Sequence, residues 1–363
     1  MINRRAFLQQ LSLGASGLLL SEQALSYAED GKKLGIALVG LGNYATNQLA
    51  PALQQTSLCR LAGIVTGTPE KAEKWSKQYN IPAKNIYNYQ TFDQIKDNPD
   101  IDIVYVVLPN AMHAEYSIRA AQAGKHVICE KPMALNVKEC QDIINACQKA
   151  NVKLSVGYRL YFEPHHLEMR RLGMQKVFGG VKLMESSLGF SMADPKIWRL
   201  DKALGGGGAI MDLGVYCIQG ARRTVGELPI AVTAQGYVRN RDVFKGIYET
   251  MLFQMEFPDG AISNSTTTYT SYVDRLHATT GWQWFSLSPS YNAIGTAGKY
   301  FDGEEHVMPF KNTDYQQIKQ MDAFADSILS NKPVEASGEE GLIDLKIIEA
   351  IKQAADTGQR VTI

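Results

Sequence analysis

The 363-residue chain has few cysteines and no surplus of charge of either sign. Its five cysteines include no Cys-x-x-Cys pair, so a zinc or thioredoxin-like site is not indicated and we expect no bound metal. Lysine plus arginine and aspartate plus glutamate each number 37, and no basic stripe is visible, which argues against nucleic acid as a partner. The 45% hydrophobic content is nevertheless sufficient for two ordinary domains.

The sequence also lacks an apolar run long enough to span a membrane, so we expect no membrane partner. Residues 11–20 are apolar, but they supply about half of the roughly 20 residues that a spanning helix needs. They follow Arg4 and Arg5 and precede the small-x-small sequence Ser26-Tyr27-Ala28. This pattern predicts a twin-arginine signal peptide at residues 1–28 and a periplasmic protein. A disordered amphipathic tail is the alternative.

Residues 29–157 form the first predicted domain, in which apolar strands alternate with helices. The predicted strands are 34–39, 59–65, 101–108, 126–129 and 152–156, and the predicted helices are 44–55, 69–79, 112–123 and 136–150. This alternation predicts an α/β fold with an N-terminal Rossmann domain, a doubly wound parallel sheet covered on both faces.

Residues 158–363 form the second predicted domain, in which period-two segments dominate. The predicted strands are 181–190, 230–238, 248–257, 261–269 and 275–280, and the predicted helices are 164–174, 315–329 and 341–357. A Pro-Asp-Gly hairpin turn at 258–260 separates two of the strands. We expect a C-terminal α+β domain with a large, mostly antiparallel open sheet.

The turn after the first strand carries a dinucleotide-binding pattern. Gly40, Gly42, Asn43 and Tyr44 follow the strand, and Ala45 takes the third glycine position at the start of the helix. A glycine-rich turn lets the backbone approach a pyrophosphate, so these residues are candidate cofactor contacts. A tight turn in an unrelated α/β protein is the alternative.

An acidic residue is missing after the second strand, where NAD-binding folds use one to bind the ribose 2′-hydroxyl. Thr66, Gly67 and Thr68 occupy that place, and Lys71 lies just beyond. Hydroxyl groups and an ammonium suit the 2′-phosphate of NADP, so the sequence predicts NADP(H) as cofactor. A solvated Lys71 with NAD as cofactor is the alternative.

Polar clusters also follow the later strands, at the sheet edge where open α/β sheets bind ligands. In the second domain, four glycines at 205–208 lead into an apolar helix with Asp212 and Tyr216. These two residues are four apart, so we expect them to share a helix face, and a buried pair of this kind needs hydrogen-bond partners. Turn chemistry and structural hydrogen bonds are the alternatives. The strand-end candidates are Pro109, Asn110, His113, Glu130, Lys131, Gly157, Tyr158 and Arg159.

These residues resemble the glucose–fructose oxidoreductase / inositol dehydrogenase family over nearly the whole mature length. The shared marks are Glu130-Lys131-Pro132 and the glycine-rich run into Asp212. Many family members have histidine where this chain has Tyr216, which is similar to the glucose–fructose oxidoreductase branch itself. Trp198-Arg199-Leu200 and the segment 337–341 are also similar to that branch.

The resemblance implies that Lys131 and Tyr216 act at the reacting carbinol and that Asp212 orients the sugar or the tyrosine. Exported members of the branch carry a proline-rich arm after the cleavage site. Here only residues 29–33 separate that site from the first strand, so we do not expect such an arm to enclose the cofactor. The resemblance places the following residues near the nicotinamide ribose or in the sugar pocket: Asn110, His113, Glu130, Arg159, Trp198 and Arg199.

The expected function is a sugar oxidoreductase that keeps its NADP(H). Free tyrosine has a pKa of about 10, and a nearby ammonium favours tyrosinate, so Lys131 would allow Tyr216 to act as the general base. Outside the cytoplasm no soluble NADP pool would recycle the cofactor. We therefore expect ping-pong oxidation of an aldose to its lactone and reduction of a second sugar to an alditol. NAD(P)-dependent glycoside hydrolysis by oxidation and elimination, and a non-enzymatic nucleotide or sugar sensor, are the alternatives.

The expected partners are small-molecule sugars and further copies of the chain. Trp282 and Trp284 alternate in a possible strand, and an exposed sheet face with such residues is typical of a subunit interface. Burial in the domain core is the alternative. We expect a homo-oligomer, dimer or tetramer, formed through the C-terminal sheet.

Overall fold

The computed structural model describes residues 20–192, 194–311 and 313–363. Arg4, Arg5 and all but the last residue of the predicted apolar stretch lie outside the described residues. The chain divides into two compact units, which we treat separately. One is the Rossmann unit, the described part of Leu18–Arg159 together with Tyr315–Ile343, and the other is the C-terminal unit, Leu160–Asp314 with Asp344–Ile363.

This division differs from the prediction that 158–363 form one continuous domain. The segment Tyr315–Ile343 belongs to the Rossmann unit because Met321, Phe324 and Ala325 are buried in the same hydrophobic cluster as the first strands. Burial of these side chains removes apolar surface from water, and the pattern of the sequence alone does not say against which sheet a helix packs.

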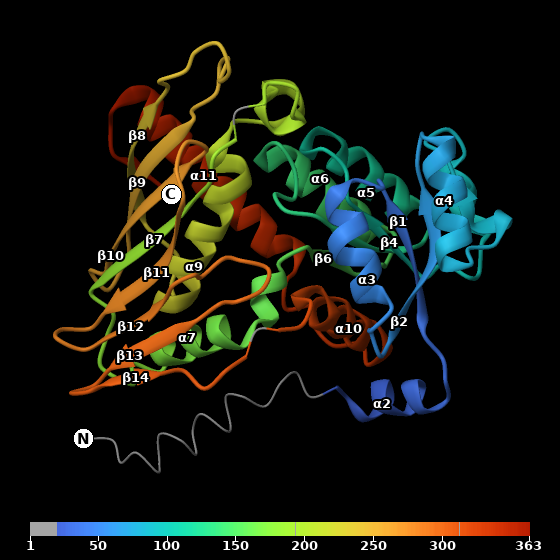
Figure 1. Cartoon of the computed structure of the whole chain (residues 1–363), viewed down its shortest axis with the longest axis horizontal. Helices are drawn as coiled ribbons and strands as arrows, with labels where there is room; N and C mark the ends of the chain where they lie inside the picture. Colours follow the sequence, from blue (N-terminus) through green and yellow to red (C-terminus); the bar gives the residue numbers. More distant parts are fainter. Residues whose placement is uncertain (1–19, 193, 312) are drawn as a thin grey trace. The chain divides into compact units, whose positions relative to one another are not determined.

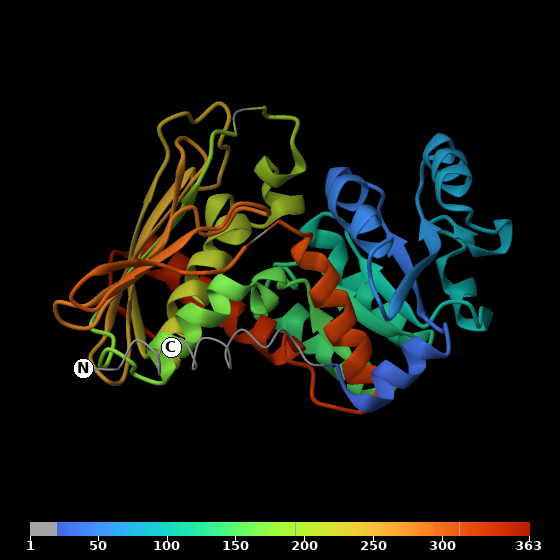
Figure 2. The same cartoon turned by 60° about the horizontal axis from the view of Figure 1, so that its bottom comes forward.

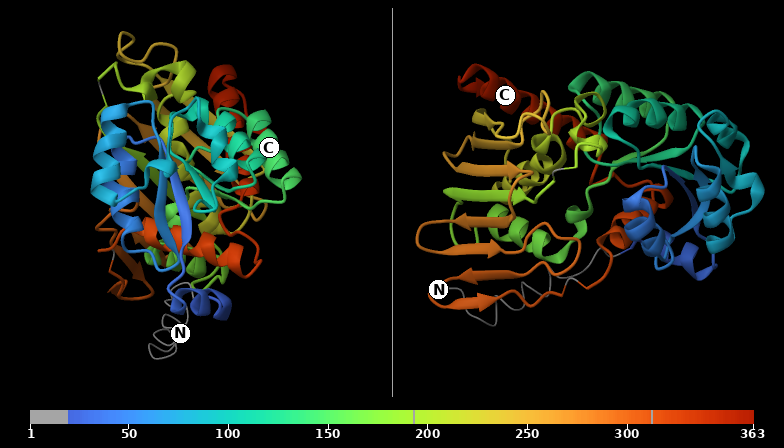
Figure 3. Two further views of the ribbon diagram at one scale, coloured as in Figure 1. Left: turned by 90° about the vertical axis from the view of Figure 1, so that its right-hand side faces the viewer. Right: turned by 45° about the horizontal axis from the view of Figure 1, so that its top comes forward.

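The Rossmann sheet is parallel throughout and has the strand order β3-β2-β1-β4-β5-β6. This order and the alternating helices, which lie on both faces of the sheet (Figure 3), confirm the predicted doubly wound fold. β3 is a two-residue strand that the sequence did not reveal. The strands are β1 Leu34–Val39, β2 Cys59–Val65, β3 Ile86–Tyr87, β4 Ile103–Val106, β5 His126–Cys129 and β6 Leu154–Val156.

The helices of this unit follow local signals in the sequence. The Asn136 side chain caps α6 by accepting from the Glu139 amide at 2.9 Å, as the capping pattern predicted. The predicted helix 44–55 is instead a π-helical turn, η1 Ala45–Leu49, followed by the short α3 Ala50–Leu53, which has Pro51 in its first turn. The remaining helices are α2 Glu22–Glu29, α4 Pro69–Tyr79, η2 Ala83–Asn85, η3 Phe92–Asp97, η4 Asn110–Met112, α5 His113–Gln122, α6 Val137–Lys149 and α10 Gln316–Leu329.

The C-terminal unit contains a nine-stranded sheet of order β14-β13-β12-β11-β7-β10-β9-β8-β15 (Figure 1). Only β7 and β10 pair in parallel, so the prediction of a mostly antiparallel open sheet is confirmed. The strands are β7 Leu183–Gly189, β8 Ala231–Tyr237, β9 Thr250–Glu256, β10 Ile262–Thr268, β11 Val273–Thr279, β12 Trp284–Leu287, β13 Gly298–Phe301, β14 Glu305–Val307 and β15 Val361–Thr362.

Helices cover one face of this sheet, whereas the other face is open (Figure 2). The strands alternate accordingly: in β9, Met251, Phe253 and Met255 are buried, whereas Leu252 and Gln254 are exposed. The helices are η5 Arg159–Phe162, α7 Pro164–Met174, η6 Trp198–Leu200, α8 Lys202–Gly205, η7 Ile210–Gly214, α9 Val215–Val225 and α11 Gly338–Thr357. Within the described ranges, no helix has the length and apolar character that a membrane crossing requires.

Candidate functional site

The phosphate-binding turn of the Rossmann unit requires its two glycines for different reasons. Gly40 has φ +95°, and a Cβ there would lie 2.5 Å from the carbonyl oxygen of Val107, so no side chain fits. Around Gly42, by contrast, no described heavy atom lies within 4 Å of the place of a Cβ. The turn therefore presents bare backbone to an approaching phosphate, which is the feature that a dinucleotide site needs.

The end of β2 lies beside this turn. The Lys71 ammonium donates to the carbonyl oxygen of Leu41 at 3.1 Å, although the side chain is exposed. Thr66 is buried, and its hydroxyl accepts from the amide of Thr68 at 3.2 Å. The tertiary structure thus brings Lys71, Thr66 and Thr68, which follow β2, close to the glycine-rich turn that follows β1. These residues fit a nucleotide that carries an additional phosphate on its ribose.

His113 contacts both the loop after β4 and the loop after β5. Its Nδ1 lies 2.8 Å from the carbonyl oxygen of Pro132, and its Nε2 lies 2.8 Å from that of Leu108. Burial lowers the pKa of His113 to about 4, despite the two carbonyl contacts that oppose this shift. Both ring nitrogens therefore contact the backbone, and His113 fixes the loops that carry Asn110 and Lys131.

Glu130 follows β5 and is buried. One carboxylate oxygen accepts from the Tyr105 hydroxyl at 2.6 Å, and the other accepts from the Lys131 amide at 3.2 Å. Burial raises the pKa of Glu130, although the hydrogen bond from Tyr105 and the charges of Lys131 and Arg159 lower it. The carboxylate thus holds the backbone of the lysine that follows it.

The segment after β6 leaves space for the Glu130 carboxylate. A Cβ on Gly157 would lie 2.6 Å from the Glu130 carboxylate, so only glycine leaves the necessary space. Arg159, two residues later, is buried and donates to the side-chain oxygen of Gln316. The sequence placed Glu130 and Arg159 in separate strand-end clusters, and the sheet brings both to one network.

In the C-terminal unit, the glycine-rich run makes a strained turn before η7. Gly206, Gly207 and Gly208 all have positive φ, at 86°, 158° and 76°. A Cβ on Gly208 would lie 2.4 Å from the carbonyl oxygen of Tyr248, so this position requires glycine because the backbone at Tyr248 approaches it closely.

Asp212 lies in the π-helical turn that follows. Its Oδ2 accepts from the Tyr269 hydroxyl at 3.0 Å and from Arg199 Nε at 3.1 Å. The Arg199 guanidinium in turn lies over the Trp198 ring, 4.4 Å from its centroid. Three predicted residues, Trp198, Arg199 and Asp212, are therefore neighbours, together with Tyr269, which we did not predict.

Tyr216 has different neighbours from Asp212. Its ring centroid lies 6.0 Å from that of Tyr291, and it lines a small cavity with Leu160 and His166. The predicted shared face used α-helical spacing, but the segment Ile210–Gly214 is a π-helix, whose backbone bonds span five residues. Such irregular turns are frequent at functional sites.

Four residues of these networks were not predicted from the sequence: Tyr269, Tyr105, Gln316 and Gln320, whose side-chain amide donates to the Tyr105 hydroxyl at 2.7 Å. Tyr269 ends a predicted strand, and the two glutamines begin a predicted helix, but nothing in their spacing marks them. Among the described residues, no group of three or more His, Cys, Asp or Glu side chains could hold a metal ion.

Comparison with known families agrees with this arrangement. Residues 34–158 match the oxidoreductase family with an NAD-binding Rossmann fold, and residues 166–301 match the GFO/IDH/MocA C-terminal domain.

Individual relatives cover nearly the whole chain. The solved aldose-aldose oxidoreductase from Caulobacter crescentus, complexed with glycerol, is 39% identical, covers 92% of this chain and 100% of its own, and has a TM-score of 0.88. D-xylose 1-dehydrogenase [NADP(+)] of Haloarcula marismortui is 26% identical, covering 90% of this chain and 92% of the relative. Levoglucosan dehydrogenase, solved with NADH and levoglucosan, is 20% identical, covers 92% of this chain and 100% of its own, has a TM-score of 0.78, and shows the same fold. The chain therefore belongs to the glucose–fructose oxidoreductase / inositol dehydrogenase (GFO/IDH/MocA) family and is a nicotinamide-dependent oxidoreductase.

Proposed function

We propose that this protein is an NADP(H)-dependent sugar oxidoreductase that keeps its cofactor bound and works on two sugars in turn. An aldose is oxidised to its lactone, and a second sugar is then reduced to its alditol. The observation that carries the proposal is the 39% identity, over 92% of the chain, with a protein named as an aldose-aldose oxidoreductase. An enzyme of this kind needs no external nucleotide for turnover.

The proposal assigns the proton transfer to Tyr216 and the supporting charge to Lys131. A phenol can exchange a proton with a carbinol oxygen, and the Lys131 ammonium would supply a positive charge that supports this transfer. Tyr216 would accept the hydroxyl proton of the first sugar and return it to the carbonyl oxygen of the second. The bound nicotinamide supplies the chemistry of hydride acceptance and donation.

Asp212 would orient the sugar. Its Oδ2 already has two donors, Tyr269 and Arg199, so the carboxylate is held in one position. A sugar hydroxyl can donate to such a carboxylate, because an ionised carboxylate accepts about four hydrogen bonds. Trp198 and Arg199 would line the same pocket.

Residues of the Rossmann unit support NADP over NAD. Gly42 leaves open space at the phosphate turn, and Lys71 reaches the same turn from the end of β2. A lysine at this position adds a cation where the 2′-phosphate would lie, and Thr66, Gly67 and Thr68, the residues directly after β2, include no acidic side chain.

The proposed periplasmic location fits this mechanism. Residues 1–28, including Arg4 and Arg5, carry the export prediction, and retention of the cofactor through export would explain how the enzyme works away from the cytoplasmic pool. Both the location and the retention are parts of the proposal.

The test is to identify the nucleotide in purified, dialysed protein by mass spectrometry and then to titrate it with sugars. We expect NADP rather than NAD, reduced-nicotinamide absorbance on addition of glucose, and loss of that absorbance on addition of xylose. Tyr216→Phe should retain the nucleotide and lose turnover, whereas the control Tyr272→Phe, at a 71% exposed position, should behave as wild type. Dialysed enzyme that is empty and requires added NADP would overturn the proposal. Release of nitrophenol from a nitrophenyl glycoside without net nicotinamide reduction would favour the glycosidase alternative.

A further inference from the structure

Helix α10 buries three glutamines at its N-terminal end, although glutamine is usually exposed. Gln316, Gln317 and Gln320 are only 5%, 1% and 1% exposed. All three lie in the Rossmann unit, to which α10 returns after the strands of the C-terminal sheet. A buried side-chain amide usually has hydrogen-bond partners, so the partners of these three glutamines show which segments α10 contacts.

Each glutamine contacts a different segment at the edge of the Rossmann sheet. Gln316 accepts from Arg159, which follows β6. Gln317 donates to the hydroxyl of Tyr44, in the phosphate-binding turn, at 2.9 Å. The third residue, Gln320, donates to the hydroxyl of Tyr105, in β4, at 2.7 Å. One helix thus contacts the phosphate-binding turn, β4 and the segment after β6.

The contact of Gln320 fixes the direction of a hydrogen bond. Because its amide donates to the Tyr105 oxygen, the single hydroxyl hydrogen of Tyr105 is directed to Glu130 Oε1, 2.6 Å away. Glu130 then accepts from the Lys131 backbone amide through its other oxygen. The chain of contacts runs from Gln320 through Tyr105 and Glu130 to the residue that we assign to catalysis.

We propose that Gln320 and Tyr105 are positioning residues that keep Glu130 in place beneath Lys131, and that Gln316 positions Arg159 in the same way. This inference rests on the proposed function of Lys131. Tyr105 and the three glutamines lie outside the sequence motifs of the cofactor site, so their role follows from the contacts alone.

The charged and titratable groups around Glu130 determine in which direction its pKa changes when Tyr105 is replaced. Burial raises its pKa, whereas the hydrogen bond from Tyr105 and the charges of Lys131 and Arg159 lower it. The Cys129 thiol is a further neighbour, and burial raises its pKa far above neutral, so it stays uncharged. Removal of the Tyr105 hydroxyl takes away one of the interactions that lower the pKa of Glu130. Burial then raises the pKa with less compensation, so we expect a higher value.

The experiment compares wild type, Tyr105→Phe and Gln320→Met in protein labelled with ¹³C at the glutamate carboxyl carbons, the Glu130 signal being assigned with Glu130→Gln. We expect the apparent pKa of Glu130 to rise in both variants, and more in Tyr105→Phe. The acid limb of the kcat–pH profile should move to higher pH, and kcat at neutral pH should fall by about tenfold with a smaller change in KM.

Ser327→Ala is the matched control, because Ser327 is also buried on α10 but its hydroxyl donates to the carbonyl of Ala323. It should lower the melting temperature without a change in the Glu130 titration. If Tyr105→Phe and Gln320→Met behave like this control, their role is only structural and the inference fails. If wild type shows no sugar-dependent turnover, the proposed function fails, but the Glu130 titration still decides whether these residues position the carboxyl. Gln320→Met keeps the test valid should Tyr105→Phe not fold.

Discussion

At the scale of single residues, the site depends on partners that hold the functional groups in place. Asp212 was a candidate from its position after the glycine-rich run, but its carboxylate is oriented by Tyr269 and Arg199. Burial raises the pKa of Tyr269 well above its ordinary value, and the charge of Asp212 raises it further. Tyr269 therefore stays protonated and donates a hydrogen bond across the accessible pH range.

We predict that Tyr269→Phe weakens sugar binding through Asp212. A hydrogen bond to a charged group contributes about 1.5–3 kcal/mol, and because Arg199 still holds the carboxylate, we expect the lower end of this range. KM for the aldose should rise by about tenfold, and kcat should change less. Steady-state kinetics measure this effect. Equal parameters in wild type and variant would contradict the role of Tyr269, and Tyr272→Phe is the exposed control.

At the scale of elements, two helices far apart in the sequence, α2 and α10, pack against each other in the Rossmann unit. Helix α2 is capped by Ser21, whose amide and hydroxyl both donate to Asp326 on α10, and Ala24 is fully buried. Burial raises the pKa of Asp326, but hydrogen bonds from Ser21, Ser330 and Lys332 outweigh it and lower the pKa below its usual range. The predicted cleavage after Ala28 would remove most of α2.

We therefore predict that the mature protein begins at or before Ser21, which intact mass and N-terminal sequencing of the exported protein would determine. Deletion of residues 20–28 should lower the melting temperature by several degrees, since it exposes the α10 surface. Because the pKa of Asp326 is depressed in the folded state, its stabilising contribution is present above the ordinary pKa of aspartate, about 4, and is lost as the pH falls through the depressed value. A mature protein that starts at Glu29 with unchanged stability would show that α2 is dispensable.

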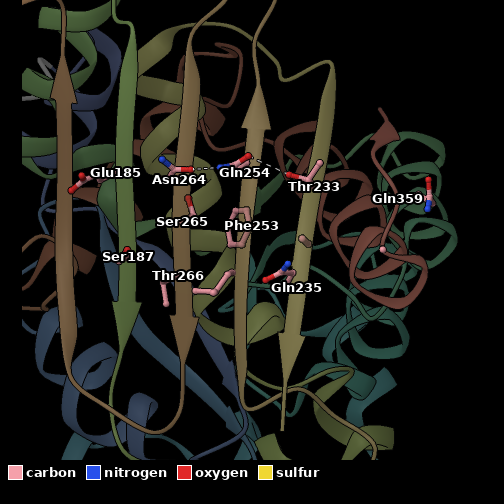
Figure 4. A pocket seen from close by; sticks show the side chains of 13 residues that line it. Glu185, Ser187, Thr233, Gln235, Phe253, Gln254, Asn264, Ser265, Thr266 and Gln359 are labelled. Atoms are coloured by element: carbon pink, nitrogen blue, oxygen red, sulfur yellow. Dashed lines mark hydrogen bonds between the residues drawn. The ribbon is translucent and has the colours of Figure 1, made fainter.

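At the scale of the whole molecule, the open face of the C-terminal sheet is the surface that we assign to self-association. A row of side chains crosses four strands of this face: Thr233, Gln254, Asn264 and Glu185 (Figure 4). Gln254 donates to Asn264 at 2.7 Å, and Thr233 donates to Gln254 at 3.4 Å. Trp282, between β11 and β12, is 68% exposed, so the alternative of burial in the core is wrong for this tryptophan.

We predict that a second copy of the chain covers this face, because no described helix of the C-terminal unit covers it and its side chains pair across strands. Light scattering after gel filtration should show a dimer or tetramer for wild type. Asn264→Arg, which places a bulky charged side chain in the middle of the row, should shift the protein towards monomer. Lys74→Glu, on an exposed face of α4, is the control and should leave the mass unchanged. A monomeric wild type would overturn the prediction.

The sequence by itself determined the two folds, the phosphate-binding turn and the family, because hydrophobic periodicity and glycine spacing are local properties of the chain. Most strand and helix limits followed from the same patterns, as in β1, β2 and α4. Only the tertiary structure decided that α10 belongs to the Rossmann unit, that Gln320 reaches Tyr105, and that Tyr269 reaches Asp212. These contacts join residues 57 to 215 positions apart, and packing of buried side chains, which no local pattern encodes, selects them.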